Sequence, residues 1–400
     1  MKLIQIGAGN IGRSFIGQLF SRSGWEVVFI DVNSRLVSLL NERRYYPVVI
    51  KREGMADEKR LIGPVRAVDG SDAEAAAGEI AGADILAVSV GKPALTAIFP
   101  VIAEGLRRRC VPQRHEALPA KPLNIIIAEN IRGAKALFRT ALSKELGPGC
   151  PLKDLAGLVE TSIGKMVPIM RAEDLAADPL QLFAEEYETL IVDRKGFIGE
   201  LPKINGLWAV ENIEAYVDRK LFIHNLGHAA AAYLGCKADP SKPLIAEVMA
   251  VPELERAVRK AMNEAADALA AEYPDAYGRD DLAEHIDDLV KRFANRALGD
   301  TVYRVGRDLS RKLGRDDRIT GAMLLCAKRG LPFSGIAEVY RAAFDFTAQD
   351  EGGRQFPADV QFFQHTAALA GEDLFKTISG LDGSRRTDRA VLEELHRLFD

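Results

Sequence analysis

The stretch from Tyr216 to Ala230, YVDRKLFIHNLGHAA, carries side chains of the kinds that oxidise an alcohol without a metal ion. At about 100° per residue, an α-helix would spread four of them over roughly 140° of one face: Lys220, His224, His228 and Asn225. Metal-free alcohol oxidation requires an amine that loses a proton, flanked by donors that hold an oxygen. The alternative interpretation is that the lysine and the asparagine face solvent while the histidines pack in the core.

A second motif lies at the N-terminus. The apolar run Lys2–Ile6 predicts a strand, and Gly7-Ala8-Gly9-Asn10-Ile11-Gly12 follows it at once, with a helical pattern through Phe20. A second predicted strand, Glu26–Ile30, ends in Asp31, about 20 residues past the glycines. Strand, G-x-G-x-x-G, helix, strand and acid in this order are typical of a dinucleotide-binding βαβ unit.

The positions of this motif have distinct physical roles. Gly7 permits a tight turn, Gly9 lets the backbone approach a pyrophosphate, and Gly12 allows close packing of helix on strand. The pyrophosphate would lie on the helix N-terminus, where free N–H groups favour an anion. Asp31 would accept hydrogen bonds from the adenosine ribose and repel a 2′-phosphate, so we expect NAD rather than NADP. The positive charge of Arg35 nearby weakens this preference slightly.

Polar residues also follow two later strands. Asp84–Val90 ends in Gly91, and Leu123–Ala128 ends in Glu129-Asn130. Ligands of open parallel sheets gather at the carboxyl ends of the strands, so we expect Gly91 and Asn130 near the nicotinamide end of the cofactor; Asn130 is also a common turn residue. The expected cofactor contacts are Gly7, Gly9, Asn10, Ile11, Gly12, Asp31 and Gly91.

Four hundred residues exceed what one hydrophobic core usually organises, so two domains are expected. Residues 1–200 predict an α/β, Rossmann-type doubly wound sheet, with further strands at Tyr45–Ile50, Arg60–Val68 and Phe183–Asp193. Residues 201–400 predict a mostly α-helical second domain. Its helices are expected at Arg256–Glu272, Asp280–Arg296, Thr320–Lys328, Ser334–Ala348, Phe362–Leu369 and Thr387–Leu398.

A basic run, YRVGRDLSRKLGRDDR, lies between these helices. Such runs are usually solvated faces, but Gly306 and Gly314 interrupt the helical pattern here and acids are interleaved. A folded loop that holds an anion is therefore possible. The expected substrate contacts within it are Arg304, Arg307 and Arg311.

Composition limits the possible partners. The formal net charge of −4 makes a broad nucleic-acid surface unfavourable. No run of about 18 apolar residues indicates a membrane span, and Met1 leads directly into a strand, which leaves no room for a signal peptide. The four scattered cysteines have no metal-like spacing. We therefore expect a cytoplasmic, monomeric protein that binds neither metal, nucleic acid nor membrane.

These motifs resemble the polyol-specific long-chain dehydrogenase/reductase family along nearly the whole chain. The segments that carry the resemblance are GAGNIGRSFIGQLF, AENIRG, RKLFIHNLGHA, RFANRAL, RVGRDLSRKL and ISGLDG. Its most specific element, K-x-x-x-x-N-x-x-H, begins at Lys220. The resemblance implies that this lysine is the general base, that Asn225 and Asn130 hold the substrate oxygen, and that His228 orients the substrate. The total length resembles the branch that acts on hexitol phosphates.

Two departures from the family pattern affect the substrate site. The family usually has an Asp-Arg pair before an apolar-Val-Pro element, where TSIGKMVP here has Gly164-Lys165. We therefore expect Lys165 to contact substrate in place of that pair. His224 stands where the family has an apolar residue, one helical turn from Lys220 and His228. It is either a core histidine or a residue that reshapes the substrate pocket.

We therefore expect an NAD-dependent oxidoreductase that interconverts a hexitol phosphate and a ketose phosphate by direct hydride transfer. A free lysine has a pKa of about 10.4 and a base near neutrality needs roughly 7–8, so burial must lower the pKa of Lys220. One alternative is an oxidoreductase of hexuronates or of unphosphorylated polyols and ketoses. An alternative of another class is a non-catalytic protein that senses NAD, which the intact lysine, asparagine and histidine disfavour.

Overall fold

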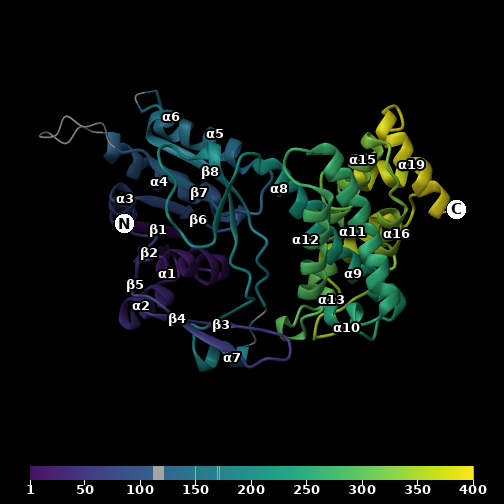
Figure 1. Cartoon of the computed structure of the whole chain (residues 1–400), viewed down its shortest axis with the longest axis horizontal. Coiled ribbons are helices and arrows are strands. Elements are labelled where there is room, and N and C mark those ends of the chain that lie inside the picture. Colours follow the sequence, from purple (N-terminus) through teal and green to yellow (C-terminus); the bar gives the residue numbers. More distant parts are fainter. Residues whose placement is uncertain (111–120, 149, 169, 171, 400) are drawn as a thin grey trace, which may run out of the picture. The chain divides into compact units, whose positions relative to one another are not determined.

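The computed structural model describes residues 1–110, 121–148, 150–168, 170 and 172–399 (Figure 1). The chain forms two compact units, Met1–Ile213 and Glu214–Asp400. The first unit extends past residue 200, where the loop composition had suggested a boundary. The reason is a short strand, β11 (Leu207–Val210), which follows that loop and pairs with β10 (Leu190–Asp193).

An eight-stranded sheet organises the first unit, in the order β11-β10-β8-β7-β6-β1-β2-β5. Neighbouring strands are parallel except β10 and β8. The other strands of this sheet are β1 (Lys2–Ile6), β2 (Glu26–Asp31), β5 (Val65–Asp69), β6 (Ile85–Val88), β7 (Leu123–Ile127) and β8 (Ala156–Ser162). The strand order steps outward from β1 in both directions, which confirms the doubly wound topology that the sequence predicts.

Both faces of this sheet are buried, because successive side chains of a strand point to opposite faces. On β1, Leu3 packs in the same cluster as Phe15 and Phe20, whereas Ile4 packs in the cluster of Phe138. Helices therefore cover both faces (Figure 1). The helical segments of this unit are η1 (Gly12–Gly17), α1 (Gln18–Arg22), α2 (Ser34–Arg43), α3 (Ala73–Ala81), η2 (Lys92–Ala94), α4 (Leu95–Cys110), α5 (Ala134–Leu146), α6 (Leu152–Leu155), α7 (Ala172–Ala177) and η3 (Arg194–Gly196).

Two of the expected strands are each divided between two sheets. The run Arg60–Val68 forms the end of β4 (Glu58–Ile62) and most of β5, because Pro64 cannot donate to a strand ladder and ends the first strand. The run Phe183–Asp193 likewise divides into β9 (Leu182–Ala184) and β10. The small second sheet has the order β4-β3-β9, with β3 spanning Tyr46–Ile50.

The second unit is helical and centres on α11 (Pro252–Glu272), which packs against α9, α12, α15 and α16. The six predicted helices are confirmed with shifts of up to about five residues at their ends, and several further helices, α18 among them, were not predicted. The other segments are α8 (Ile213–Arg219), η4 (Lys220–Asn225), α9 (Leu226–Ala238), α10 (Ile245–Met249), α12 (Arg279–Phe293), η5 (Arg296–Leu298), α13 (Val302–Gly306), α14 (Leu309–Lys312), α15 (Thr320–Arg329), α16 (Ser334–Ala343), α17 (Pro357–Thr366), α18 (Gly371–Ser379) and α19 (Arg386–Phe399).

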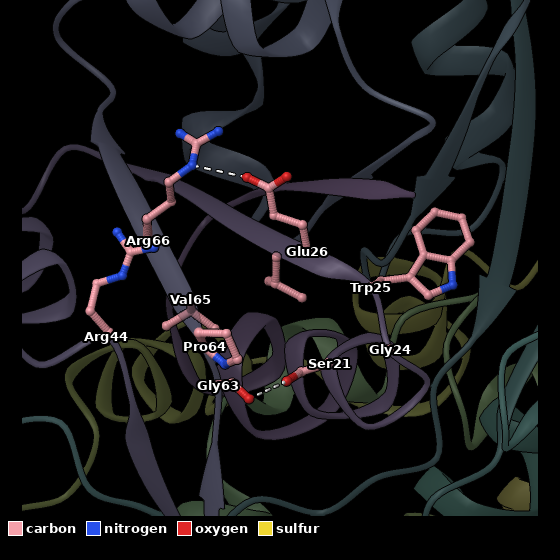
Figure 2. A pocket seen from close by; sticks show the side chains of 10 residues that line it. Ser21, Gly24, Trp25, Glu26, Arg44, Gly63, Pro64, Val65 and Arg66 are labelled. Atoms are coloured by element: carbon pink, nitrogen blue, oxygen red, sulfur yellow. Dashed lines mark hydrogen bonds and ion pairs between the residues drawn. The ribbon is translucent and has the colours of Figure 1, made fainter.

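A pocket of about 360 Å³ opens on the first unit beside the first residues of β2 and β5 (Figure 2). Glu26 and Arg66 line it, and both lie at the amino ends of their strands. The glycine-rich loop follows the carboxyl end of β1, so the pocket lies at the opposite edge of the sheet from the expected cofactor site. In the part of the chain described, no helix is both long and apolar enough to cross a membrane.

Candidate active site

The glycine-rich loop has the local geometry that a dinucleotide requires. Gly7 has a φ of +90°, and a Cβ there would collide with the carbonyl oxygen of Ser89. A Cβ on Gly12 would collide with the carbonyl oxygen of Gly7. At Gly9, in contrast, no atom lies within 4 Å of an added Cβ. The first and third glycines are thus needed for packing, while the second leaves the loop open to an approaching pyrophosphate.

Asp31, the last residue of β2, holds this loop and is also the candidate ribose acceptor. Its Oδ2 accepts a hydrogen bond from the backbone N–H of Ala8 at 2.7 Å, and its Oδ1 accepts one from Asn33 at 2.9 Å. Each carboxylate oxygen has a further lone pair, so the same side chain holds the loop and keeps acceptor capacity for a ribose. Asn10 and Ile11 begin the helix that continues into η1.

Gly91 and Asn130 lie in neighbouring loops that Glu129 joins. The carboxylate of Glu129 accepts hydrogen bonds from the backbone N–H groups of Val90 at 2.7 Å and Gly91 at 3.1 Å. Burial raises the pKa of Glu129. Because β6 and β7 are adjacent and parallel, the loops after them meet at one edge of the sheet. The sequence indicated this edge but not the carboxylate that holds it.

The expected catalytic helix differs locally from an α-helix. Lys220–Asn225 forms a π-helical turn between α8 and α9, so the angles calculated for an α-helix do not apply across it. A turn closed by i→i+5 hydrogen bonds brings Asn225 closer to the azimuth of Lys220 than the 140° of an α-helix would. Turns of this kind are rare and frequently lie at functional sites. A second one, η1, follows the glycine-rich loop.

Burial, together with the positive charge of Arg318, lowers the pKa of Lys220 to about 8. The side chain is half-buried. An ammonium group loses solvation when it is buried, so the neutral amine is favoured. The direction of this shift is the one that a general base near neutral pH requires.

His228 lies beside the ring of Phe293 and the carboxylate of Asp300, two residues that were not predicted from the sequence. Its imidazole stacks on Phe293 with 4.8 Å between ring centroids and 3° between planes. Its Nε2 lies 3.3 Å from Oδ2 of Asp300. Burial lowers the pKa of His228 to about 3, so the imidazole is neutral despite that carboxylate. The only signal in the sequence was the position of Phe293 in the family segment RFANRAL.

His224 packs behind this group. It is buried, with its ring centroid 6.3 Å from that of His228 and 5.7 Å from that of Phe293. Burial lowers the pKa of His224 well below its ordinary value, so this ring is neutral too. Of the two alternatives that the sequence left open for His224, these contacts favour the core histidine. Gly227 allows α9 to approach α11, because a Cβ there would lie 2.5 Å from Sδ of Met262.

The three arginines expected to bind substrate have different surroundings. Arg304 forms an ion pair with Asp300, and Arg311 forms ion pairs with Asp308 at 2.5 Å and Asp317 at 3.2 Å. The guanidinium of Arg307 is exposed and lies over two aromatic rings, at 5.7 Å and 5.3 Å from their centroids. Among the described residues, no carboxylate lies within ion-pair distance of it. Arg307 is therefore the arginine of the three that is available for an added anion.

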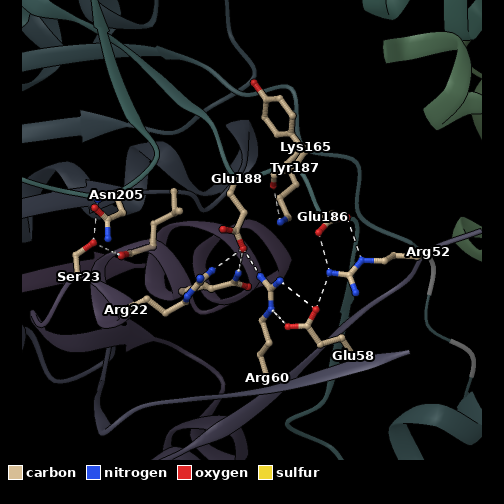
Figure 3. A network of polar contacts seen from close by, with 12 residues as sticks. Arg22, Ser23, Arg52, Glu58, Arg60, Lys165, Glu186, Tyr187, Glu188 and Asn205 are labelled. Carbon is tan, nitrogen blue, oxygen red and sulfur yellow. Dashed lines mark hydrogen bonds and ion pairs between the residues drawn. The ribbon is translucent and has the colours of Figure 1, made fainter. Parts of the chain in front are cut away.

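Lys165 lies in the interior of the first unit. It is 7% exposed, its Nζ donates a hydrogen bond to the carbonyl oxygen of Tyr187 at 2.7 Å, and it lies 5.4 Å from the ring centroid of Phe15 (Figure 3). The loop that contains Tyr187 is held further by ion pairs. Glu186 pairs with Arg52 in the turn between β3 and β4, and Glu188 pairs with Arg60 of β4 and Arg22 of α1. These contacts give Lys165 a role in holding this loop.

In the described ranges, no group of three or more His, Cys, Asp or Glu side chains is arranged to hold a metal ion. A Rossmann unit with a glycine-rich loop and a strand-end acid, followed by a helical unit with a lysine of lowered pKa, defines a dinucleotide-dependent dehydrogenase. The chain belongs to the mannitol dehydrogenase family. Residues 1–206 match the mannitol dehydrogenase Rossmann domain, and residues 212–382 match the mannitol dehydrogenase C-terminal domain.

Relatives of known name cover almost the whole chain. A mannitol-1-phosphate 5-dehydrogenase of Bacillus subtilis (strain 168) is 36% identical over 88% of this chain and 90% of its own. One from Brevibacillus brevis is 32% identical over 100% of this chain and 98% of its own. These matches confirm the resemblance that the sequence motifs indicated. They also make the chain an oxidoreductase whose cofactor is NAD.

Two solved structures share the fold. A D-sorbitol dehydrogenase in substrate-free form superposes with a TM-score of 0.77 at 17% identity, covering 99% of this chain and 92% of its own. The mannitol 2-dehydrogenase of Pseudomonas fluorescens, solved with NAD and D-mannitol, has a TM-score of 0.71 at 17% identity and covers 100% and 92%. At this identity the likeness concerns the fold, a Rossmann unit followed by a helical unit.

Proposed function

We propose that this enzyme interconverts a hexitol phosphate and a ketose phosphate, with mannitol 1-phosphate and fructose 6-phosphate as the pair. Two observations support the proposal. The relatives that match over nearly the whole chain are named mannitol-1-phosphate 5-dehydrogenases. The helical unit also offers an exposed guanidinium, that of Arg307, with no carboxylate partner among the described residues.

Lys220 is the proposed general base. When bound, NAD supplies the acceptor for the hydride that leaves the substrate carbon. The neutral amine of Lys220 takes the proton of the reacting hydroxyl, and its pKa of about 8 makes the neutral form abundant near neutral pH. In the reduction, the ammonium form returns this proton to the oxygen. The chemistry assigned to the side chains of the enzyme is thus proton transfer without a metal ion.

Asn225 is the proposed donor to the substrate oxygen as its negative charge develops. A preorganised donor of this kind contributes on the order of 3 kcal/mol in comparable sites. The π turn supports this assignment, because it brings Asn225 towards the side of the helix that carries Lys220. The family resemblance assigns a second donor role to Asn130.

His228 is the proposed orienting residue. Its neutral imidazole is held by the stacked ring of Phe293, with Asp300 beside Nε2, and it can present a ring nitrogen to a substrate hydroxyl. Asp300 also pairs with Arg304, and therefore links the histidine to α13.

The phosphate group is proposed to bind at Arg307. A sugar phosphate carries nearly two negative charges, and a guanidinium can hold a phosphate through two parallel hydrogen bonds. Arg304 precedes Arg307 by three positions at the end of α13, and burial and the charge of Arg307 both lower the pKa of Arg304. An added dianion would relieve this repulsion.

The test is a comparison of substrates with NADH as the reductant. We expect a kcat/KM for fructose 6-phosphate about 10- to 150-fold higher than for fructose, since a charge-assisted bidentate contact contributes roughly 1.5–3 kcal/mol. Equal activity on the two ketoses would contradict the phosphate assignment, and preference for a hexuronate would indicate the alternative oxidoreductase. Absence of turnover with every polyol and ketose would favour an NAD-sensing protein.

A further inference from the structure

Arg13 is a buried cation at the start of the helix that follows the glycine-rich loop. It follows Gly12 directly and is 7% exposed. Its Nε donates to the carbonyl oxygen of Ala8 at 2.6 Å, and its Nη1 donates to that of Leu180 at 2.8 Å. No acid among the described residues lies within ion-pair distance of it. Burying a charge that is not neutralised is costly, so we looked for what these two contacts maintain.

The first contact completes a clamp on the glycine-rich loop. The N–H of Ala8 donates to Asp31 at 2.7 Å, while the carbonyl of Ala8 accepts from Arg13. Ala8 lies between Gly7 and Gly9 and is itself fully buried. The loop residue that precedes the open position at Gly9 is therefore held from both ends, by side chains of opposite charge.

The second contact ties this clamp to the small sheet. Leu180 is fully buried and lies just before β9, and it is 167 positions away from Arg13 in sequence. The hydroxyl of Tyr46, on β3, donates to the backbone carbonyl oxygen of Arg13 at 2.8 Å. Strands β3 and β9 are neighbours in the small sheet. Arg13 thus connects the loop expected to bind pyrophosphate with two strands of a separate sheet.

We propose that Arg13 is a positioning residue for the dinucleotide: it holds the glycine-rich loop in its binding conformation by fastening it to the small sheet. A loop fixed before binding loses less entropy when the cofactor arrives. A guanidinium suits this role because its planar fork reaches two separate carbonyl groups, whereas a lysine presents its donors at one point. The inference rests on NAD binding and not on the sugar substrate.

The test measures NADH binding to the full-length enzyme by fluorescence. We expect Arg13→Met to raise the dissociation constant for NADH by about tenfold or more, because the loop loses a charge-assisted hydrogen bond. Arg13→Lys should recover only part of this loss. The matched control is Arg22→Met at the end of α1, the helix that continues η1, where a 47% exposed side chain pairs with Glu188. It should change the constant by less than about twofold.

Two further measurements separate positioning from general destabilisation. The KM for NADH should rise while the KM for the sugar substrate stays within about twofold, which a loss of folded protein would not produce. Arg13→Met and Asp31→Asn should also combine non-additively, because both act on Ala8. If Arg13→Met does not fold, Arg13→Lys and Tyr46→Phe decide the question with the same assay.

Unchanged NADH affinity in the folded Arg13 variants would overturn the inference, as would strict additivity with Asp31→Asn. A wrong assignment of the sugar substrate would give a different result from a wrong assignment of Arg13. The enzyme would then bind NADH with the expected dependence on Arg13 and still fail to reduce fructose 6-phosphate.

Discussion

Replacing Lys220 by methionine should stabilise the folded protein at neutral pH while it removes activity. The pKa of Lys220 is lowered from 10.5 to about 8, mainly by burial. Below pH 8 the folded protein must therefore carry a poorly solvated ammonium group. One pKa unit corresponds to about 1.4 kcal/mol, so the cost at pH 7 is about 3 kcal/mol. Methionine has a similar length and no charge, so the variant avoids this cost.

The sign of the pH dependence follows from proton binding. Between pH 8 and 10.5 the unfolded chain holds the proton of this lysine and the folded protein does not, so the stability of the unmodified enzyme rises with pH. The advantage of Lys220→Met should therefore shrink from about 3 kcal/mol at pH 7 to about 1 kcal/mol at pH 9.5. Urea unfolding at the two pH values measures both quantities. Lys237→Met, at a 49% exposed site on α9, is the control and should show no such change.

The same variant tests catalysis. Turnover should fall by at least about 100-fold while NADH binding is retained, and the rate of polyol oxidation by the unmodified enzyme should rise with pH up to about 8. A stability difference that does not vary with pH would refute the burial of an ionisable amine. Retained turnover would refute its role as the base.

Three other changes test neighbouring assignments. Asp31→Ala should narrow the preference for NAD over NADP mainly by raising the KM for NAD, and equal use of both cofactors by the unmodified enzyme would contradict the role of Asp31. Arg307→Ala should raise the KM for fructose 6-phosphate by about tenfold or more and leave that for fructose unchanged; equal effects would exclude a phosphate contact. Asp300→Asn should lower kcat/KM for the sugar by about tenfold or more without altering NADH affinity, because it uncouples His228 from Arg304; unchanged sugar kinetics would contradict this.

The local pattern of apolar, polar and glycine residues was sufficient to predict the architecture of the first unit and the cofactor motif. Strands such as Leu123–Ile127 are continuous apolar runs bounded by polar residues, so their type and position follow from neighbouring residues alone. The same holds for the glycines, since Gly7 and Gly12 are required by contacts within a few residues or with the adjacent strand. The lysine-bearing helix was likewise visible from its spacing, although its π turn was not.

The partners of these residues depended on tertiary structure, because each comes from a distant part of the chain. Asp300 reaches His228 across 72 positions, and Leu180 reaches Arg13 across 167. The run of arginines shows the same limit: the sequence counted its cations, but only folding paired Arg304 with Asp300 and left Arg307 exposed. Burial is also a property of the folded chain. A lysine acquires a pKa of about 8 only where packing removes water from around it, and no local pattern of residues specifies that.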